Sequence, residues 1–202
     1  MKIKTAEFVI SNTDYKECPA PQIPEYAFIG RSNVGKSSLI NALANNRKLA
    51  KTSGKPGKTQ LINHFLINKS WYLVDLPGYG FAKTSKIKRV EFHNMITKYL
   101  LNRTNLMCLF VLIDSRHVPQ AIDQEFMQWL AENEIPFVLV FTKTDKLKNT
   151  MLLKHIEKYK LEMLTRWEKL PEIFISSAAK KTGINKLITY IELLNPQFNK
   201  II

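Results

Sequence analysis

The motif that most restricts the fold of this chain lies at residues 30–37, with the sequence GRSNVGKS. It follows an apolar run at 26–29 and precedes helix-forming sequence, so it joins a strand to a helix. It matches the pattern G-x-x-x-x-G-K-[S/T], in which backbone N–H groups converge on phosphate oxygens at the positive end of a helix. A strand–loop–helix unit of this kind belongs to α/β folds with a largely parallel sheet.

Each residue type in this loop suits phosphate binding. Gly30 and Gly35 let the backbone wrap closely, Lys36 can reach the β- and γ-phosphates of a nucleotide, and the Ser37 hydroxyl is placed to ligate Mg²⁺. Kinases, ATPases and GTPases all use such a loop, so it selects neither a base nor a reaction. The predicted phosphate-binding residues are Gly30, Arg31, Ser32, Asn33, Val34, Gly35, Lys36, Ser37 and Ser38.

Apolar runs rich in β-branched and aromatic residues predict six strands. They lie at residues 26–29, 61–67, 71–74, 107–113, 137–141 and 173–175. Segments with helical spacing separate most of them, which indicates a mostly parallel sheet covered on both faces by helices. Only three residues separate the second run from the third, so these two should form an antiparallel hairpin. The expected fold is α/β, with a mostly parallel six-stranded sheet that contains one antiparallel strand.

The length of 202 residues favours a single domain. We expect that domain at residues 26–202, after a proline-containing lead-in at residues 1–25. Cys18 and Cys108 show neither disulfide nor metal spacing and are expected to be reduced thiols. The N-terminus has no export signal and no apolar run is long enough to cross a bilayer, so a cytoplasmic protein is expected.

A carboxylate closes the expected strand at 71–74, in the sequence DLPG at residues 75–78. There Asp75 can hold the shell of Mg²⁺ through water, and the Gly78 N–H could meet a γ-phosphate. Taken alone, D-x-x-G is most often just a turn. After a phosphate-binding loop and at a strand end, it predicts a nucleotide site.

The sequence TKTD at residues 142–145, together with SA at 177–178, resembles the translation-factor class of small GTPases. The Asp145 carboxylate would accept hydrogen bonds from guanine N1–H and the exocyclic amino group, and would face repulsive acceptors on adenine. The resemblance implies that the Lys143 stem stacks on the base and that the Ala178 N–H donates to guanine O6. Thr142 and Ser177 complete the two motifs. An isolated TKTD is more often a helix N-cap, but here four motifs occur in order.

Nearly the whole chain resembles the EngB family of bacterial GTPases. The matching segments are GRSNVGKSSLIN at 30–41, KPGKTQ at 55–60, DLPGYG at 75–80 and DSRH at 114–117. The resemblance implies a Ras-like P-loop GTPase domain, Mg²⁺ as cofactor, and a role in assembly of the large ribosomal subunit. It also implies a connection with cell division and septation.

The stretch at 45–60 contains the expected first switch. Thr59 could complete the Mg²⁺ shell only when the γ-phosphate is present, with Gly57 and Lys58 beside it; the alternative is a plain loop threonine.

Tyr79 follows Gly78, where many GTPases carry a Gln that positions the attacking water. Because a phenol is a poor substitute, we predict slow intrinsic hydrolysis that a partner completes.

Two residues of the phosphate loop have competing interpretations. In related GTPases, an Asn at the position of Asn33 helps to hold K⁺ near the phosphates, whereas its simpler role is to tolerate a left-handed turn. Arg31 could be an internal arginine finger, but a solvent-facing side chain is the simpler interpretation. The catalytic residues stay unassigned.

The chain carries 30 Lys and Arg against 17 Asp and Glu, a net charge of +13. Residues 26–74 contain no acid, and their basic residues are Arg31, Lys36, Arg47, Lys48, Lys51, Lys55, Lys58 and Lys69. Charge beside the switches favours a nucleotide-dependent polyanionic partner, which we expect to be a large-subunit precursor or its RNA. The alternative is a solvated lysine surface.

Two other functions were weighed. A P-loop phosphotransferase acting on a small metabolite would need an acceptor pocket and lid, and no segment is left to form them. A membrane-surface GTPase lacks a lipidation motif or a basic amphipathic helix. A monomer is expected, because a chain of this size can bury a sufficient core.

Overall fold

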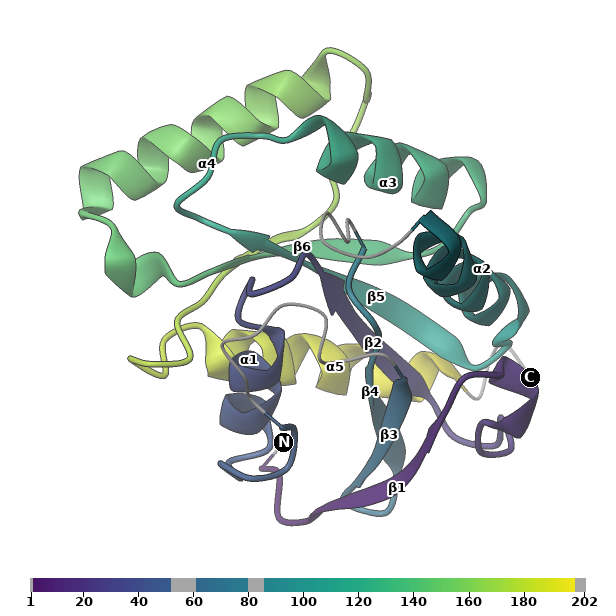
Figure 1. Cartoon of the computed structure of the whole chain (residues 1–202). Coiled ribbons are helices and arrows are strands. Elements are labelled where there is room, and N and C mark those ends of the chain that lie inside the picture. The colour runs from purple at the N-terminus through teal and green to yellow at the C-terminus, as the bar shows by residue number, and fades with distance from the viewer. Residues whose placement is uncertain (1, 52–60, 80–85, 199–202) are drawn as a thin grey trace.

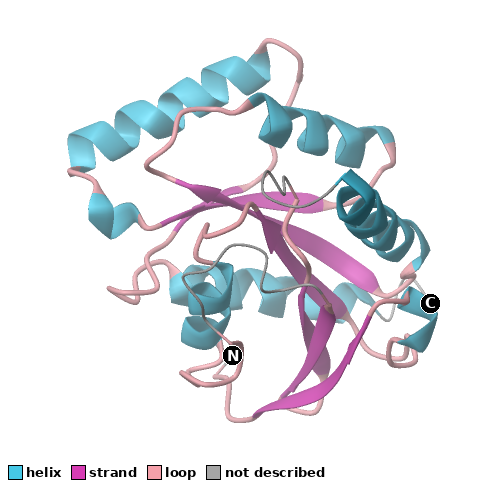
Figure 2. Ribbon diagram, viewed as in Figure 1, coloured by secondary structure: helices cyan, strands magenta, loops and turns pink. Residues whose placement is uncertain are grey.

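Seven strands form one sheet in the order β1-β3-β4-β2-β5-β6-β7 (Figures 1 and 2). The structure, a computed structural model, describes residues 2–51, 61–79 and 86–198. β3 pairs antiparallel with both of its neighbours, and the other pairs are parallel. The strands are β1 Ala6–Asn12, β2 Glu25–Gly30, β3 Ile62–Ile67, β4 Trp71–Asp75, β5 Leu106–Asp114, β6 Phe137–Thr142 and β7 Ile173–Ile175. The α/β class, the hairpin and the single antiparallel strand are therefore confirmed.

The expected number of six strands is wrong, because β1 lies within the lead-in and adds a seventh. β1 pairs with β3 from Ala6 to Asn12, with a register shift between Phe8 and Ile10. Three of its seven residues are exposed, Phe8 and Val9 among them, and only Asn12 is buried, because this strand forms an edge of the sheet. An exposed edge strand with an irregular register lacks the clean alternation that predicts strands.

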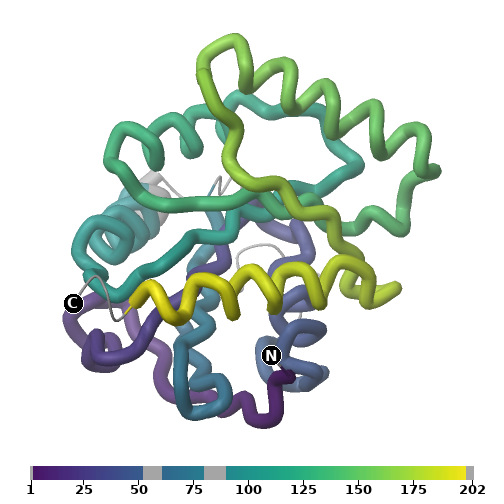
Figure 3. Tube along the Cα trace, turned by 180° about the vertical axis from the view of Figure 1, so that it is seen from behind, coloured from purple at the N-terminus to yellow at the C-terminus, as the bar shows by residue number. Residues whose placement is uncertain are grey.

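Five α-helices cover the two faces of the sheet (Figures 1 and 3). They are α1 Lys36–Leu43, α2 Lys86–Asn102, α3 Ala121–Glu132, α4 Asn149–Leu164 and α5 Ile184–Phe198. Buried side chains of α2, α3 and α4 pack in one apolar cluster with one face, and those of α1 and α5 pack in a second cluster with the other. Two 3-10 turns, Tyr15–Glu17 and Thr144–Lys146, complete the elements.

The parallel strands β2, β4, β5 and β6 end at the same edge of the sheet. Ligands of open α/β sheets bind at this carboxyl edge. The side chains that end these strands are polar or absent: Gly30, Asp75, Asp114 and Thr142. The sequence motifs therefore meet at one end of the molecule.

Candidate nucleotide-binding site

The loop between β2 and α1 is curved by two residues with left-handed backbone. Asn33 has φ 63° and Gly35 has φ 100°. Gly35 is the N-cap residue of α1, and its carbonyl accepts a hydrogen bond of 2.9 Å from the Leu39 N–H. No side chain in the described structure caps this end of α1. Its first N–H groups can therefore bind an anion.

Gly78 packs directly on the phosphate loop. A Cβ atom at Gly78 would lie 2.5 Å from the Gly30 carbonyl oxygen, and one at Gly30 would lie 2.8 Å from the Leu112 carbonyl oxygen. Neither site can accept a side chain without displacing backbone. The two glycines thus bring the end of the DLPG segment against the loop, as a site for a terminal phosphate requires.

Lys36 and Asp75 form a buried ion pair at the centre of the site. The Lys36 ammonium donates to Asp75 Oδ1, and the two residues are only 8% and 3% exposed. Burial raises the pKa of Asp75, against the opposing effect of the Lys36 charge. Sequence reasoning predicted separate partners for these residues, phosphate for Lys36 and the Mg²⁺ shell for Asp75. The structure places them in contact with each other.

A magnesium ion fits the oxygen donors near this pair. Ser37 is the second residue of α1 and offers a hydroxyl, and Asp75 offers a carboxylate; Mg²⁺ prefers such hard ligands. Within residues 2–51, 61–79 and 86–198, no three His, Cys, Asp or Glu side chains group as metal ligands. The third predicted ligand, Thr59, lies outside the described residues, as do Gly57 and Lys58.

The end of β6 is tied to the phosphate loop. The Thr142 hydroxyl donates to the Val34 carbonyl at 2.6 Å, and the Lys143 ammonium donates to the Asn33 carbonyl. Lys143 has φ 56°, and its side-chain stem lies near Gly35. This contact aligns the TKTD segment with the loop, leaving the Lys143 stem beside the phosphate half of the site.

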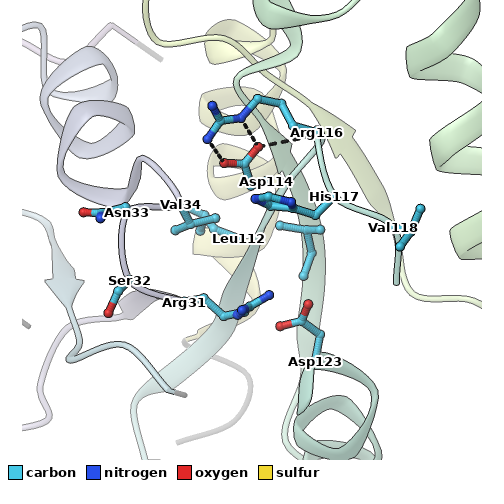
Figure 4. A pocket seen from close by; sticks show the side chains of 11 residues that line it. Arg31, Ser32, Asn33, Val34, Leu112, Asp114, Arg116, His117, Val118 and Asp123 are labelled. Carbon is cyan, nitrogen blue, oxygen red and sulfur yellow. Dashed lines mark hydrogen bonds and ion pairs between the residues drawn. The ribbon is translucent and has the colours of Figure 1, made fainter. Parts of the chain in front are cut away.

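Asp114, the last residue of β5, is a site residue that the sequence motifs did not single out for a role. Its Oδ2 accepts a hydrogen bond of 2.9 Å from Lys143 Nζ. It also accepts one of 2.7 Å from Arg116, which Figure 4 shows. Burial alone would raise the pKa of Asp114, but the bonds from Arg116 and Lys143 outweigh it and lower the pKa to about 2. Asp114 therefore stays ionised and fixes the position of Lys143. The sequence analysis named the DSRH segment at 114–117 but gave Asp114 no role. The signal that could have found it is a carboxylate at the end of a strand.

The TKTD and SA motifs meet at Asp145. The Ser177 hydroxyl donates to Asp145 Oδ1 at 2.5 Å, and this bond lowers the pKa of Asp145. Lys146 Nζ lies 3.4 Å from the other carboxylate oxygen. Ala178 follows Ser177 directly and is half-buried. An ionised, oriented carboxylate with two acceptor oxygens suits a ligand edge that presents two neighbouring N–H donors.

Sequence comparisons decide the family. A model for the 50S ribosome-binding GTPase family matches residues 25–143. A probable GTP-binding protein EngB of Christiangramia forsetii is 62% identical over 195 residues, covering 96% of this chain and 98% of the relative. One from Porphyromonas gingivalis is 58% identical over 197 residues, covering 98% of both. This chain belongs to the EngB family.

Solved structures agree with the EngB assignment. A crystal structure of a probable GTP-binding protein EngB matches with a TM-score of 0.66 and 26% identity, covering 86% of this chain and 99% of that one. Aquifex aeolicus Era, solved with GDP and AlF4⁻, matches with a TM-score of 0.67 and 24% identity, covering 86% and 57%. The second likeness shows the fold alone. The family resemblance predicted from sequence is confirmed.

Sequence reasoning expected the Arg31 side chain of this EngB-family chain to face solvent, and the structure differs. Its side chain is half-buried and lines a cavity of about 110 Å³ with Asp114, His117 and Asp123 (Figure 4). The figure shows the guanidinium extending toward Asp123, away from the neighbouring Ser32 side chain. The remaining loop residue, Ser38, is exposed on α1.

Tyr79 is buried on the α3 side of the sheet. Its ring stacks on Phe126 with centroids 4.4 Å apart. Its hydroxyl has no hydrogen-bond partner in the described structure. In this conformation of the EngB fold, the side chain after Gly78 is packed into the protein.

Among the described helices, none is long and apolar enough to cross a membrane.

Proposed function

We propose that this EngB-family chain binds GTP and GDP with Mg²⁺, hydrolyses GTP slowly, and acts as a nucleotide-dependent switch in assembly of the large ribosomal subunit. The observation that carries the proposal is the bridge made by Lys143. Its ammonium joins the phosphate loop at Asn33 to Asp114, and two residues later Asp145 is oriented by Ser177. These contacts support a single site with a phosphate half and a base half.

In the phosphate half of the site, each residue has a proposed role. The α1 N-terminus and the loop N–H groups bind phosphate oxygens, and Lys36 leaves Asp75 to pair with the β- and γ-phosphates. The Ser37 hydroxyl and, through water, Asp75 would hold Mg²⁺, with Thr59 as the third predicted ligand. When bound, Mg²⁺ neutralises charge on the phosphates. The Gly78 N–H is the proposed donor to the γ-phosphate.

The base half selects guanine. Asp145 accepts from N1–H and the 2-amino group, the Lys143 stem supports the base, and the Ala178 N–H donates to O6. Ser177 orients the carboxylate for this role, and Thr142 anchors the segment to the phosphate loop at Val34. Adenine would bring an acceptor and a C–H to Asp145, so it would bind weakly.

The position of Tyr79 supports the proposal of slow hydrolysis. A phenol buried against Phe126 cannot orient a water on the γ-phosphate. We expect turnover well below about 1 s⁻¹ for the purified protein, measured as release of GDP and phosphate from GTP. A rate at or above this value without a partner would overturn the proposal of slow hydrolysis.

Potassium is the second proposed cofactor, with Asn33 as its ligand. Asn33 also adopts a left-handed backbone with φ 63°, so the test variant must remove the proposed K⁺ ligand without changing this backbone conformation. Asn33→Gly keeps the backbone conformation and removes the side-chain oxygen. We expect hydrolysis in KCl to exceed that in NaCl for the parent chain, and the difference to vanish in Asn33→Gly. Equal rates in both salts for the parent chain would remove potassium.

The proposed partner is a precursor of the large ribosomal subunit or its RNA. We propose that this chain binds it in the cytoplasm, as a monomer. Support comes from the description of the matching family, a 50S ribosome-binding GTPase, and from the net charge of +13. Co-sedimentation with large-subunit precursors, in GDP or in a non-hydrolysable GTP analogue, tests the switch. Identical binding in both nucleotide states would reject it. The link to cell division and septation stays a prediction.

A further inference from the structure

A groove at the end of α1 away from the phosphate loop is lined by three segments that lie far apart in the sequence. Its volume is about 660 Å³, and its lining comes from the N-terminal segment, the C-terminal part of α1 and the start of α5. Figures 1 and 3 show the N-terminal segment beside α1. Ala42, Ile184 and Ile188 give the groove an apolar part. Its exposed polar lining consists of Lys2, Asn45, Lys181, Asn185 and Thr189.

The charge at this groove has one sign. Among its lining residues in the part of the chain that the structure describes, none is acidic, whereas Lys2 and Lys181 are basic. Residues 47–51, which we call the basic segment, follow α1 and add three exposed basic side chains. A surface with this charge attracts a polyanion, and lysine and asparagine side chains donate hydrogen bonds to phosphate and sugar oxygens. The basic side chains of the segment are Arg47, Lys48 and Lys51.

One buried side chain fixes the basic segment to α1. Asn41 is 8% exposed, and its Nδ2 donates to the Arg47 carbonyl at 3.1 Å and to the Ala50 carbonyl at 2.9 Å. Its Oδ1 accepts a hydrogen bond of 2.7 Å from the Ala50 N–H. Ala50 is itself buried in the apolar cluster of α1 and α5. None of these three bonds involves the phosphate loop, so they hold the basic segment without help from a nucleotide.

The turn between β3 and β4 holds the segment that carries Lys2. The Lys2 carbonyl accepts a hydrogen bond of 3.0 Å from Asn68 Nδ2, and Asn68 Oδ1 accepts one of 2.7 Å from the Lys4 N–H. None of these three residues is a predicted nucleotide contact. The position of Lys2 is therefore set by contacts within the protein.

Lys181 lies in the turn that follows the SA motif. The Ser177 N–H donates to the Thr182 carbonyl, and the Thr182 N–H donates to the Ser177 carbonyl, both at 3.1 Å. Lys181 has φ 53° within this turn. The proposed contact of the motif, from the Ala178 N–H, is made to the base, which GDP and GTP share. We therefore expect Lys181 to keep its position when GTP replaces GDP.

We propose that the groove and the basic segment form a docking surface for the backbone of double-stranded RNA, and that this surface is the same in the GDP-bound and GTP-bound forms. This inference rests on the proposed function and specifies its RNA partner. Unpaired RNA is bound largely by stacking of bases on aromatic side chains, and no described residue that lines the groove is aromatic. An RNA duplex is instead recognised by its shape and by contacts to phosphates and 2′-hydroxyls. The nucleotide-dependent part of binding then lies elsewhere on the molecule.

The test measures binding of a labelled RNA duplex of about 20 base pairs by fluorescence anisotropy, with Mg²⁺ and either GDP or a non-hydrolysable GTP analogue. Lys2→Ala combined with Lys181→Ala should weaken binding by at least about fivefold in both nucleotide states. The slope of log affinity against log salt should fall by about 1.5, because each lost phosphate contact accounts for about 0.7 to 0.9. The matched control replaces the exposed Lys154 and Lys158 of α4 by Ala and should change the affinity by less than about twofold.

Asn41→Ala tests the fixed position of the basic segment without removing charge. Loss of its three hydrogen bonds should loosen the segment and weaken duplex binding by about two- to fivefold in both nucleotide states, with the salt slope unchanged. The lysine pair keeps the test decisive where Asn41→Ala folds poorly, because both lysines are exposed.

Four results would overturn the inference. They are no binding of the duplex by the parent chain, an effect of the lysine pair in only one nucleotide state, an equal effect of the control pair, and tighter binding of a single strand of the same length. A polyglutamate peptide that competes as strongly as unlabelled duplex would assign the surface to an acidic protein and also overturn it. Failure of the parent chain to bind guanine nucleotides would instead overturn the proposed function.

Discussion

At the residue scale, one lysine connects the two halves of the site. Lys143 adopts a left-handed backbone conformation and donates both to the phosphate loop and to Asp114. Its ammonium is therefore committed to protein partners, and only its stem is free to support a base. The neighbouring Asp145 keeps its carboxylate oriented through Ser177. We propose that specificity for the base depends on that carboxylate.

We predict that Asp145→Asn weakens GDP binding by at least about 100-fold, because one acceptor oxygen is replaced by a donor that faces a donor of guanine. The same variant should gain affinity for xanthosine diphosphate, whose base carries a carbonyl where guanine carries an amino group. Calorimetry with both nucleotides measures the exchange of preference.

Lys146→Ala is the matched control for that variant. Its ammonium also approaches Asp145, but the side chain is 60% exposed and an exposed ion pair contributes little. GDP affinity should change by no more than about threefold. If Asp145→Asn and Lys146→Ala behaved alike, Asp145 would not be the residue that contacts the base.

Sequence reasoning reached the motif residues but not the side chains that hold them. Lys36, Asp75 and Asp145 could be proposed as site residues because nucleotide chemistry fixes their spacing. Asp114 and Asp123 act by contacts between distant segments, with Lys143 and Tyr159 respectively, and no local pattern encodes such contacts. The side-chain direction of Arg31 depends on the same tertiary packing.

At the element scale, a buried network fixes β2, β3 and α2 together at the end of the sheet away from the phosphate loop. Glu25 accepts a hydrogen bond of 2.7 Å from Tyr99 and pairs with Arg103, both on or just beyond α2. His64 Nε2 of β3 lies 3.2 Å from Glu25. Because β3 begins just after the expected first switch at 45–60, this network provides a fixed end for that segment.

We predict that this network makes stability depend on pH in acid. Burial would raise the pKa of Glu25, but hydrogen bonds from His64 and Arg103 outweigh it and lower the pKa from 4.5 to about 2. The carboxylate therefore stabilises the fold above pH 4.5, and this contribution is lost as the pH falls toward 2. The loss is about 3 kcal/mol, on the scale of 1.4 kcal/mol per pKa unit.

Urea unfolding of the parent chain and of Glu25→Gln between pH 5 and pH 2 measures this contribution. The variant should be less stable at pH 5 and should lose less stability on acidification. Glu157→Gln, an exposed side chain of α4, is the control and should follow the parent chain. Parallel loss of stability in the parent chain and Glu25→Gln would contradict the role given to Glu25.

Sequence patterns predicted every strand but β1, and the strands they predict most clearly are those buried on both faces. β2, β5 and β6 consist almost wholly of buried residues, so continuous apolar runs mark them. β1 was missed because its partner is 50 or more residues away and its outer edge is exposed. Edge strands depend on pairing that composition does not reveal.

At the scale of the whole molecule, basic charge lies on the face that carries α1. Arg47, Lys48 and Lys51 are exposed just beyond that helix. We propose that these residues contact the ribosomal partner, which the family match and the net charge of +13 support. Binding that releases counterions must weaken as salt rises.

We predict that replacing Arg47, Lys48 and Lys51 by Ala weakens binding to large-subunit precursors and flattens its salt dependence, by a slope of about 2 to 3 in log affinity against log salt. A control that replaces Lys154, Lys158 and Arg166, which are exposed at or near α4, removes the same charge from elsewhere. Sedimentation at several salt concentrations compares the two. Equal effects would show that only net charge matters.

The central proposal is that one site binds the phosphates of a nucleotide and selects guanine as its base. Calorimetric titration of the parent chain with GDP and with ADP, both with Mg²⁺, tests it most directly. We predict that GDP binds at least about 100-fold more tightly than ADP. Equal affinities, a preference for ADP, or no binding of either nucleotide would contradict it.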